Sequence, residues 1–207
     1  MVDAKPYHHG DLENEVRAAA LDIIAKDGPS AFTLREVASR AGVSHTAPRY
    51  HFGDKRQLLT TLATEGFELL DTMMAEAAAG IDDPRQALIA QVGAYVKLHT
   101  EHAGYAGVMW RLDLLHREDP ALSGSSLAAF RSLHDTVLRV TRSGSSSLDP
   151  YQLSLMLWSL AHGVSELSSR FSPAIAKGVG IDDHAAPDDP VALAEGFSRM
   201  IVTCVTS

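Results

Sequence analysis

The sequence has a single cysteine, few aromatic residues and no long apolar run. Cys204 alone cannot form a disulfide within the chain or a cysteine-based zinc site. It lies in an apolar pattern and is interpreted as a small buried residue rather than a nucleophile. No run of about 18 apolar residues is present, and the start MVDAKPYHHGDL lacks the apolar centre of a signal peptide. We therefore expect a cytoplasmic protein that does not bind a membrane.

The motifs of several enzyme classes are also missing. There is no G-x-S-x-G, no H-E-x-x-H and no phosphate-binding loop, and the segment GVGIDD lacks the third glycine of a dinucleotide loop. His99 and His102 have a spacing that could hold a metal, but no cysteine or set of flanking carboxylates completes the site. We therefore expect no enzyme activity, no catalytic residue, no cofactor and no metal.

No segment alternates apolar and polar residues with the period of a strand; apolar residues instead recur every three or four positions. This pattern predicts an all-α protein of about nine helices. Helix starts are expected at Thr33 with Glu36, at Asp54 with Gln57, and at the Asp-Pro pairs 83–84, 149–150 and 189–190. Ser44 is expected to cap a short helix, Gly104 to break a helix, Ser123 to begin one, and residues 172–189 to form a loop.

The net charge of −8 is unevenly distributed. Residues 1–60 carry eight Lys or Arg and eight Asp or Glu, so the whole acidic excess lies in residues 61–207. Residues 28–60 hold five basic groups against only Glu36 and Asp54. Attraction to phosphate depends on charge within about 10 Å. The local basic excess is therefore compatible with DNA binding, and the acidic remainder is expected to face away from DNA.

Residues 33–59 read TLREVASRAGVSHTAPRYHFGDKRQLL. They predict a helix, a tight turn at Gly42, a short helix, a break at Gly53 and a long helix, which is the layout of a helix-turn-helix DNA-binding unit. Gly42 permits the left-handed backbone that such a turn needs. The side chains left outside this unit are mostly hydrogen-bond donors: Thr33, Arg35, Ser44, His45, Thr46, Arg49, Tyr50, His51 and Lys55.

The segment GVSHTAPRYHFGDKRQLL resembles the recognition-helix signature of TetR-family repressors, and FTLREVASRA is similar to the family's first helix-turn-helix element. The resemblance covers about residues 7–60 and begins with YHHGDL. Further along, LWSLAHGVSEL at residues 157–167 resembles a Trp…His-Gly signature in the ligand domain of one subset of these regulators. The resemblance implies an all-helical homodimer. We place its three-helix DNA-binding domain at residues 1–53 and its ligand-binding and dimerisation domain at residues 54–207.

Position by position, the resemblance implies phosphate contacts from Thr33, Ser44, Tyr50, His51 and Lys55, and base contacts from His45, Thr46 and Arg49. The chemistry agrees, because hydroxyl groups and helix N-termini bind phosphate and an arginine can donate two hydrogen bonds to guanine. Arg49 stands where the family often has an aromatic residue, and Pro48 falls inside the short helix, where it removes a backbone donor. The alternatives are that Tyr50 only packs and that His51 only caps the helix.

Six large or polar side chains set among apolar helical positions are candidates to line a ligand pocket: Tyr95, His99, Trp110, Phe130, Trp158 and His162. The alternative is that most of them are core residues. His162, beside Gly163, is the polar group that we expect to contact the ligand. The helix over residues 153–161 is apolar nearly all round and is expected to be covered on one side by a partner subunit.

The sequence thus predicts a ligand-responsive regulator of transcription, a repressor that a small molecule releases from a double-stranded DNA operator. Its dimer would present two short helices to successive major grooves, about 34–36 Å apart. A helical adaptor that uses the three-helix unit for protein contact is the competing interpretation. No motif encodes the ligand's identity, the operator sequence or the choice between repression and activation.

Overall fold

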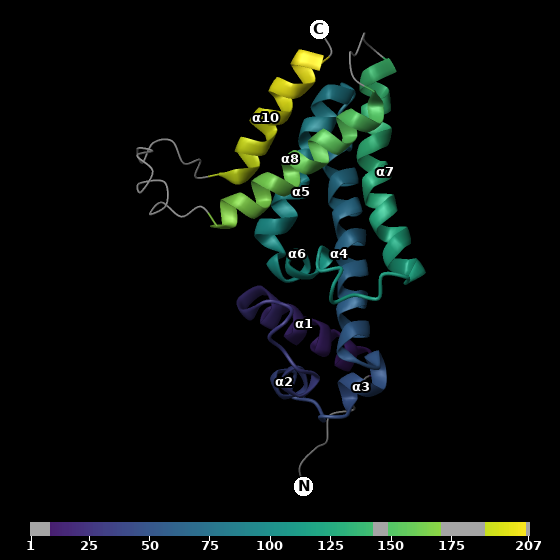
Figure 1. The fold of residues 1–207 in the computed structure, drawn as a ribbon, viewed down its shortest axis with the longest axis vertical. Coiled ribbons are helices and arrows are strands. Elements are labelled where there is room, and N and C mark those ends of the chain that lie inside the picture. The colour runs from purple at the N-terminus through teal and green to yellow at the C-terminus, as the bar shows by residue number, and fades with distance from the viewer. Residues whose placement is uncertain (1–8, 143–148, 171–188, 206–207) are drawn as a thin grey trace, which may run out of the picture. The chain divides into compact units, whose positions relative to one another are not determined.

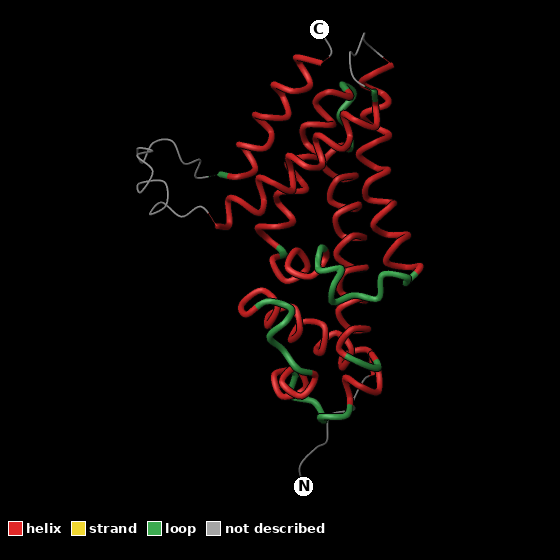
Figure 2. Tube along the Cα trace, viewed as in Figure 1, coloured by secondary structure: helices red, strands yellow, loops and turns green. Residues whose placement is uncertain are grey.

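The computed structural model describes residues 9–142, 149–170 and 189–205, and all regular structure in these ranges is helical (Figures 1 and 2). The helices are α1 (His9–Asp27), α2 (Leu34–Arg40), α3 (Ala47–Phe52), α4 (Lys55–Ala78), α5 (Pro84–Glu101), α6 (Ala103–Met109), α7 (Pro120–Arg142), α8 (Pro150–Arg170) and α10 (Pro190–Val205). The prediction of an all-α fold with about nine helices is confirmed. Among the described residues, no helix is both long and apolar enough to cross a membrane. Apart from Asp189, the predicted loop at residues 172–189 lies outside the described ranges.

The chain forms two compact units, and neither is continuous in sequence. The N-terminal unit contains Met1–Phe67 and His102–Gly124, and the C-terminal unit contains Glu68–Glu101 and Ser125–Ser207. Helix α6 therefore belongs with the helix-turn-helix segment although it follows α5 in the chain. The proposed functional boundary after residue 53 concerns which segment binds DNA, and it stays a prediction.

Four helices begin in the same way, with an aspartate followed by a proline. The side-chain Oδ1 of Asp83, Asp119, Asp149 and Asp189 accepts a hydrogen bond from the backbone N–H two residues later, at 2.9, 2.9, 2.9 and 2.8 Å. Proline fits the first helical position because its missing N–H would have no partner there. Three of these starts were predicted. The fourth, Asp119–Pro120, was missed, and α7 begins at Pro120 rather than at Ser123.

The N-terminal unit is built around α1, whose apolar stripe is buried from Leu12 through Val16 to Ile23 and Ile24. Helix α6 packs closely on α1, because a Cβ on Gly104 would lie 2.6 Å from the backbone oxygen of Leu21. The predicted break followed by a short helix is present, but it falls at His102 between α5 and α6 and not at Gly104. Gly104 lies inside α6 and permits the close approach of α6 to α1.

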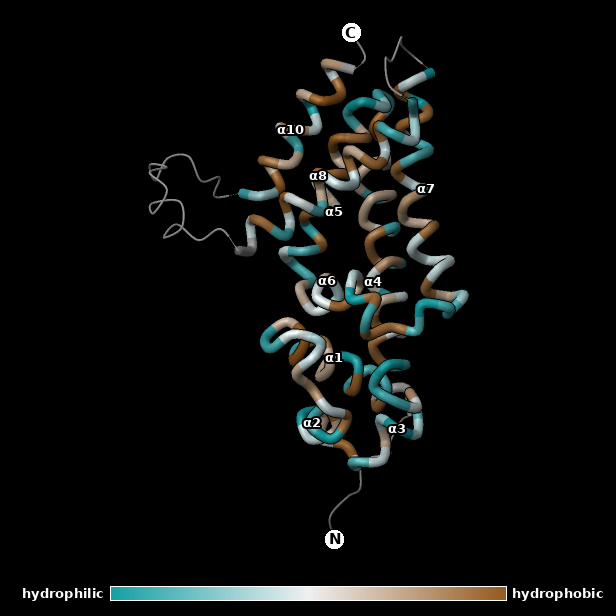
Figure 3. Tube along the Cα trace, viewed as in Figure 1, coloured by the Kyte–Doolittle hydropathy of each residue, from teal (hydrophilic) through white to brown (hydrophobic). Residues whose placement is uncertain are grey.

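In the C-terminal unit, α5 is the central helix, with side chains from Ala87 to Leu98 buried on nearly all sides by neighbouring helices that include α8 and α10. Helix α10 carries hydrophobic positions along its whole length (Figure 3). Only part of that surface is covered: Met200 is 57% exposed and Phe197 is 36% exposed. Cys204 is exposed as well, so the interpretation of this residue as buried is wrong for the single chain.

Candidate nucleic-acid interface and ligand-binding site

The turn between α2 and α3 is set by a few local interactions. Thr33 caps α2 and its hydroxyl accepts the N–H of Glu36 at 3.2 Å, as predicted. After α2, Gly42 adopts a φ of +68°, a left-handed conformation in which glycine has no steric penalty. The N–H of Val43 then donates to Ala38 at 3.0 Å, which closes the end of α2. These bonds fix the direction in which α3 leaves the turn.

Helix α3 buries one face and exposes the other. Ala47, Pro48 and Phe52 are buried, whereas Arg49 is exposed and Tyr50 is 85% exposed. The prediction that Ser44 caps this helix is wrong, because Thr46 is its N-cap and the Ser44 hydroxyl instead lies 3.3 Å from that of Thr46. Pro48 is accordingly in the first turn, where its missing N–H removes no helical bond. Its ring packs inward and helps to present Arg49 and Tyr50 to solvent.

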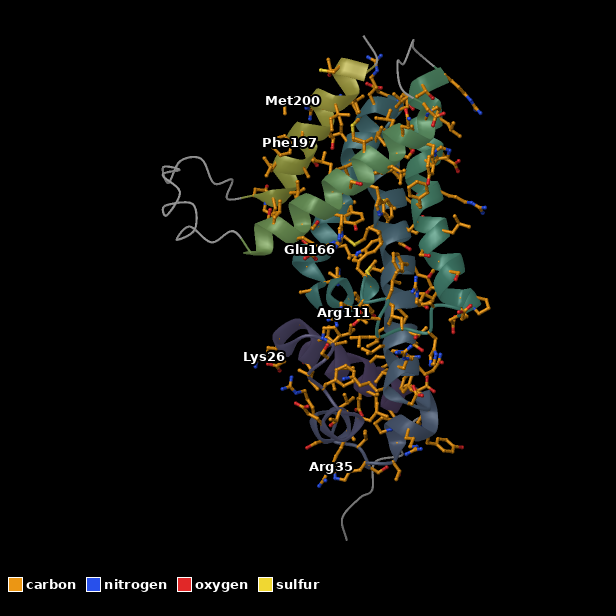
Figure 4. All side chains as sticks on the ribbon, in the orientation of Figure 1. Lys26, Arg35, Arg111, Glu166, Phe197 and Met200 are labelled. Atoms are coloured by element: carbon orange, nitrogen blue, oxygen red, sulfur yellow. The ribbon has the colours of Figure 1, made fainter. Side chains whose placement is uncertain are left out.

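The eight candidate DNA-contacting residues fall into two groups in this unit. Six are exposed around the α2 N-terminus and the start of α3: Thr33, Ser44, His45, Thr46, Arg49 and Tyr50. Arg35 is exposed on the first turn of α2 and is labelled in Figure 4. The remaining two, His51 and Lys55, are partly buried and already have partners within the unit.

His51 belongs to a chain of polar contacts that crosses the N-terminal unit. Its Nδ1 lies 3.1 Å from a Glu13 oxygen, and Arg17 contacts both Glu13 at 3.3 Å and Glu65 at 2.8 Å. The Tyr105 hydroxyl donates to Glu65 at 3.3 Å. Burial, with the neighbouring Glu65 charge, raises the pKa of Tyr105 to about 12, so this hydroxyl keeps its proton. The chain of contacts joins α3, α1, α4 and α6. Sequence periodicity gives no signal for it.

Lys55 is held at the start of α4. Its Nζ donates to the backbone oxygen of Ser30 at 2.9 Å and lies 4.8 Å from the centre of the Phe32 ring. Burial lowers the pKa of the Lys55 ammonium from its ordinary value. These contacts give Lys55 a structural role whether or not it also contacts phosphate.

Five of the six candidate ligand-contacting residues lie in the C-terminal unit, in one aromatic cluster. The ring of Tyr95 stacks on His99 with centroids 4.9 Å apart and meets Trp158 edge-on at 5.1 Å. Trp158 meets Phe130 at 5.5 Å, and the Tyr95 hydroxyl is hydrogen-bonded to His162 Nδ1 at 3.1 Å. The sixth candidate, Trp110, belongs to the N-terminal unit, where it packs edge-on against Phe67.

His99 is the member of this cluster with an unused polar atom. Its Nδ1 is 3.2 Å from the Tyr95 backbone oxygen, whereas its Nε2 is buried and has no hydrogen-bond partner within the described residues. Burial lowers the pKa of the imidazole; the hydrogen bond to Tyr95 opposes this, His162 lowers the pKa further, and Glu166 raises it. His99 is therefore uncharged near neutral pH.

A cavity of about 300 Å³ lies beside His99. Besides His99 it is lined by Thr100 on α5, by Ser165 and Ser168 on α8, and by Pro190 at the start of α10. Sequence analysis did not select the three hydroxyl residues. The available signal was the spacing of Ser165 and Ser168, three residues apart on α8. Of the described residues, no three or more His, Cys, Asp or Glu side chains are placed to hold a metal ion.

A family model described as bacterial regulatory proteins, tetR family, matches residues 16–62. This range contains α2, the turn and α3, together with most of α1. Residues 16–62 are therefore similar to the segment that this family model describes. The chain is also 38% identical over 77 residues to the HTH-type transcriptional repressor Rv3405c of Mycobacterium tuberculosis, a match that covers 37% of this chain and 41% of that protein. The matched segment thus spans about two fifths of this relative.

Solved structures resemble the chain over nearly its whole length. A protein of unknown function from Rhodococcus sp. RHA1 superposes with a TM-score of 0.78 at 25% identity, covering 99% of this chain and 100% of that chain. The transcriptional regulator FadR from Bacillus subtilis, solved in complex with stearoyl-CoA, superposes with a TM-score of 0.70 at 18% identity, covering 92% and 98%. At 18% identity, the likeness to FadR concerns the fold alone. The helices of this chain are therefore arranged as in these solved structures.

Proposed function

We propose that the protein is a ligand-responsive TetR-family repressor, a homodimer that leaves its operator when a small molecule binds the C-terminal unit. The observation that carries this proposal is the exposed face of α3, where Arg49 and Tyr50 point into solvent from a helix anchored by Ala47, Pro48 and Phe52. An exposed aromatic ring beside an arginine is costly to leave in water and is suited to a nucleic-acid surface. A regulator that acts on chromosomal DNA would work in the cytoplasm.

On DNA, we assign two roles to the candidate residues. Thr33, Ser44 and Tyr50 would contact phosphate oxygens, while His45, Thr46 and Arg49 would contact base edges in the major groove. His51 and Lys55 would reach phosphate only by sharing or leaving their present partners, Glu13 and the Ser30 carbonyl. Their main contribution would be to hold α3 and the start of α4 in place.

The homodimer is supported by apolar surface on two helices of the C-terminal unit. Leu193, Phe197, Met200 and Cys204 recur every three or four residues along α10, and the last three are exposed. On α8, Leu153 and Leu157 are buried while Leu155 is 40% exposed. Gly163 and Gly196 have open space where a Cβ would stand, so packing within the chain does not require glycine there. A second copy of this surface would bury the apolar side chains and exploit the small residues.

Placement in the subset with a Trp…His-Gly signature is also proposed. Trp158, His162 and Gly163 lie on α8, and the rings of Trp158 and His162 both meet Tyr95. This packing supports a role for the signature in building the aromatic cluster beside the cavity. That a structure of the same fold was solved with stearoyl-CoA supports the expectation that this unit takes a small molecule.

The function is tested by binding to DNA from the upstream region of the protein's own gene. A sequence-selective gel shift that weakens steeply with salt is expected, because binding displaces counterions from phosphates. The double variant Arg49→Ala, Tyr50→Ala should abolish the shift, whereas Leu127→Ala, on the exposed side of α7, should not change it. The proposal would be contradicted if the double variant still shifted the DNA, or if the wild-type protein bound DNA without sequence preference.

A further inference from the structure

We propose that Arg17, on α1, is a positioning residue for DNA binding. Acting through Glu13, its guanidinium holds His51 and so fixes the direction in which α3 presents its exposed face. The inference rests on the proposed function and adds to it a side chain that need not touch DNA. Arg17 was not among the residues that sequence analysis selected for DNA binding.

Helix α3 needs support from the rest of the N-terminal unit, because it has only six residues and helices this short are not stable by themselves. Its last two residues receive that support. Phe52 is buried. The side chain of His51 is only 15% exposed, and its Nδ1 donates to Oε1 of Glu13 at 3.1 Å, since a carboxylate oxygen only accepts. Arg49 and Tyr50, on the exposed face, therefore take their position from whatever holds His51 and Phe52.

Arg17 contacts both of these supports. Its Nη2 lies 3.3 Å from Oε2 of Glu13, the second oxygen of the carboxylate that holds His51. Its Cζ lies over the Phe52 ring, 5.2 Å from the ring centre, which is a favourable place for a cation. Because Phe52 is buried, Arg17 approaches α3 from inside the unit. One side chain of α1 thus fixes the partner of His51 and covers the ring of Phe52.

Arg17 is itself held from α4. Its Nε donates to Oε1 of Glu65 at 2.8 Å, and Oε2 of Glu65 accepts the Tyr105 hydroxyl at 3.3 Å. The guanidinium therefore directs two different nitrogens at two carboxylates, one on α1 and one on α4, which its planar, forked shape permits. An ammonium group is a single point of charge and cannot span both carboxylates in the same way. This geometry favours arginine, and not simply a positive charge, at residue 17.

The exposure of these groups explains why the effect should appear in DNA binding more than in stability. The side chains of Arg17 and Glu65 are each 26% exposed, and that of Glu13 is 41% exposed. Water can therefore solvate both carboxylates when the guanidinium is removed, and the loss of stability should stay small. Glu13, however, would no longer be fixed beside His51. Even a small change in the direction of α3 would weaken contacts with DNA, because hydrogen bonds tolerate little change in distance and angle.

The test compares the full-length protein with Arg17→Met, whose side chain keeps an apolar contact with Phe52 but loses the charge. The probe is the DNA from upstream of the protein's own gene that the gel shift uses. We expect binding to weaken about tenfold, the effect of losing one charge-assisted hydrogen bond, and Arg17→Lys to bind more tightly than Arg17→Met. The matched control is Lys26→Met, which removes an exposed cation from the same helix (Figure 4) and should change the affinity little.

A double-mutant cycle separates positioning from direct contact. If Arg17 acts through His51, the double variant Arg17→Met, His51→Ala should bind about as weakly as His51→Ala alone, whereas independent losses would multiply. Hydrogen exchange of the free protein supplies a measurement that does not involve DNA. The amide protons of Tyr50 and Gly53, which bond to carbonyls at Thr46 and Arg49, should exchange several times faster in Arg17→Met, while those of α8 keep their rates and show that the protein is folded.

Three results would overturn the inference: wild-type affinity in Arg17→Met, losses that multiply in the cycle, or wild-type exchange rates in α3. A salt dependence that falls by one charge in Arg17→Met would show that Arg17 contacts phosphate directly, and this too would overturn it. Failure of the proposed function would look different. If exchange in α3 responds to Arg17→Met but the wild-type protein binds no DNA with sequence preference, Arg17 does hold α3 and the regulatory function fails.

Discussion

Arg49 and His51 are two residues apart on α3 but have different surroundings. Arg49 is exposed with its guanidinium free to approach a base, while His51 is turned toward Glu13 on α1. A six-residue helix cannot hold its own geometry, because short helices depend on tertiary contacts. The contacts of His51 and Phe52 therefore matter to DNA binding through the position of α3, and Arg49 matters through direct contact.

Arg49→Ala is expected to weaken binding by about 1–3 kcal/mol at one base-pair position and to relax the preference there. Lys55→Ala should weaken binding to all sequences alike, and it should also lower stability, because the bond to the Ser30 carbonyl is lost. Titration of an operator with every single base-pair change measures both effects. An equal loss for Arg49→Ala at every position would mean that Arg49 contacts only the backbone.

His99 gives the stability of the protein a pH dependence. Its pKa in the folded protein is lowered by burial, with His162 and Glu166 as the facing titratable groups on α8. The imidazole of the unfolded chain therefore binds a proton more readily than that of the folded protein. As the pH falls below the ordinary pKa of about 6.5, this proton uptake favours the unfolded chain and lowers the free energy of unfolding. Relative to His99→Asn, the wild-type free energy of unfolding should decrease between about pH 7.5 and pH 5.5. Parallel denaturant titrations of the two proteins check this, and a constant difference would contradict it.

At the scale of elements, the sequence was informative wherever a local capping interaction starts a helix. Thr33, Asp54 and three of the Asp-Pro pairs were correctly identified because each cap is completed within three residues of chain. The start of α7 was missed since Ser123 was preferred over the Asp119–Pro120 pair. The role of Gly104 was not predictable, because the residue that leaves no room for a Cβ there is Leu21, which is far away in the sequence. The same limit explains why the cluster around Tyr95 could be nominated but its contacts could not.

Asp119 provides a direct measure of one such cap. Its Oδ1 accepts the N–H groups of Ala121 at 2.9 Å and Leu122 at 3.2 Å. Asp119→Ala should lower the free energy of unfolding by about 1 kcal/mol, the usual loss for an aspartate N-cap. Asp135→Ala, an exposed position in the middle of the same helix, is the control and should have little effect. Urea denaturation monitored by circular dichroism compares the two, and equal losses would show that the cap is not the cause.

At the scale of the whole molecule, the two compact units divide the predicted roles. The N-terminal unit carries the exposed face of α3, and the C-terminal unit carries the aromatic cluster and the uncovered apolar surface of α8 and α10. A single chain leaves this apolar surface in water. Covering it with a second subunit would gain roughly 25 cal/mol for each Å² of apolar area buried. A dimer formed through it would place two copies of α3 on one operator.

Met200→Glu is expected to convert the dimer to a monomer, because a buried carboxylate at the interface would have no partner. Sedimentation velocity should show half the wild-type mass, and operator affinity should fall as one half-site is lost. Leu127→Glu on α7 replaces a leucine of comparable exposure, 46% against 57%, and should leave the mass unchanged. If Met200→Glu keeps the wild-type mass, α10 is not the dimer interface.

Cys204 gives this surface a chemical reporter. It is the only cysteine in the chain, it is exposed in the single chain, and it lies one turn beyond Met200 on the same side of α10. A thiol-reactive dye can therefore attach at one place only. Its rate of attachment would be slow while a second copy covers the helix and fast after dilution below the dissociation constant. Timed alkylation across a dilution series would thus measure the affinity of the two subunits without any engineered label.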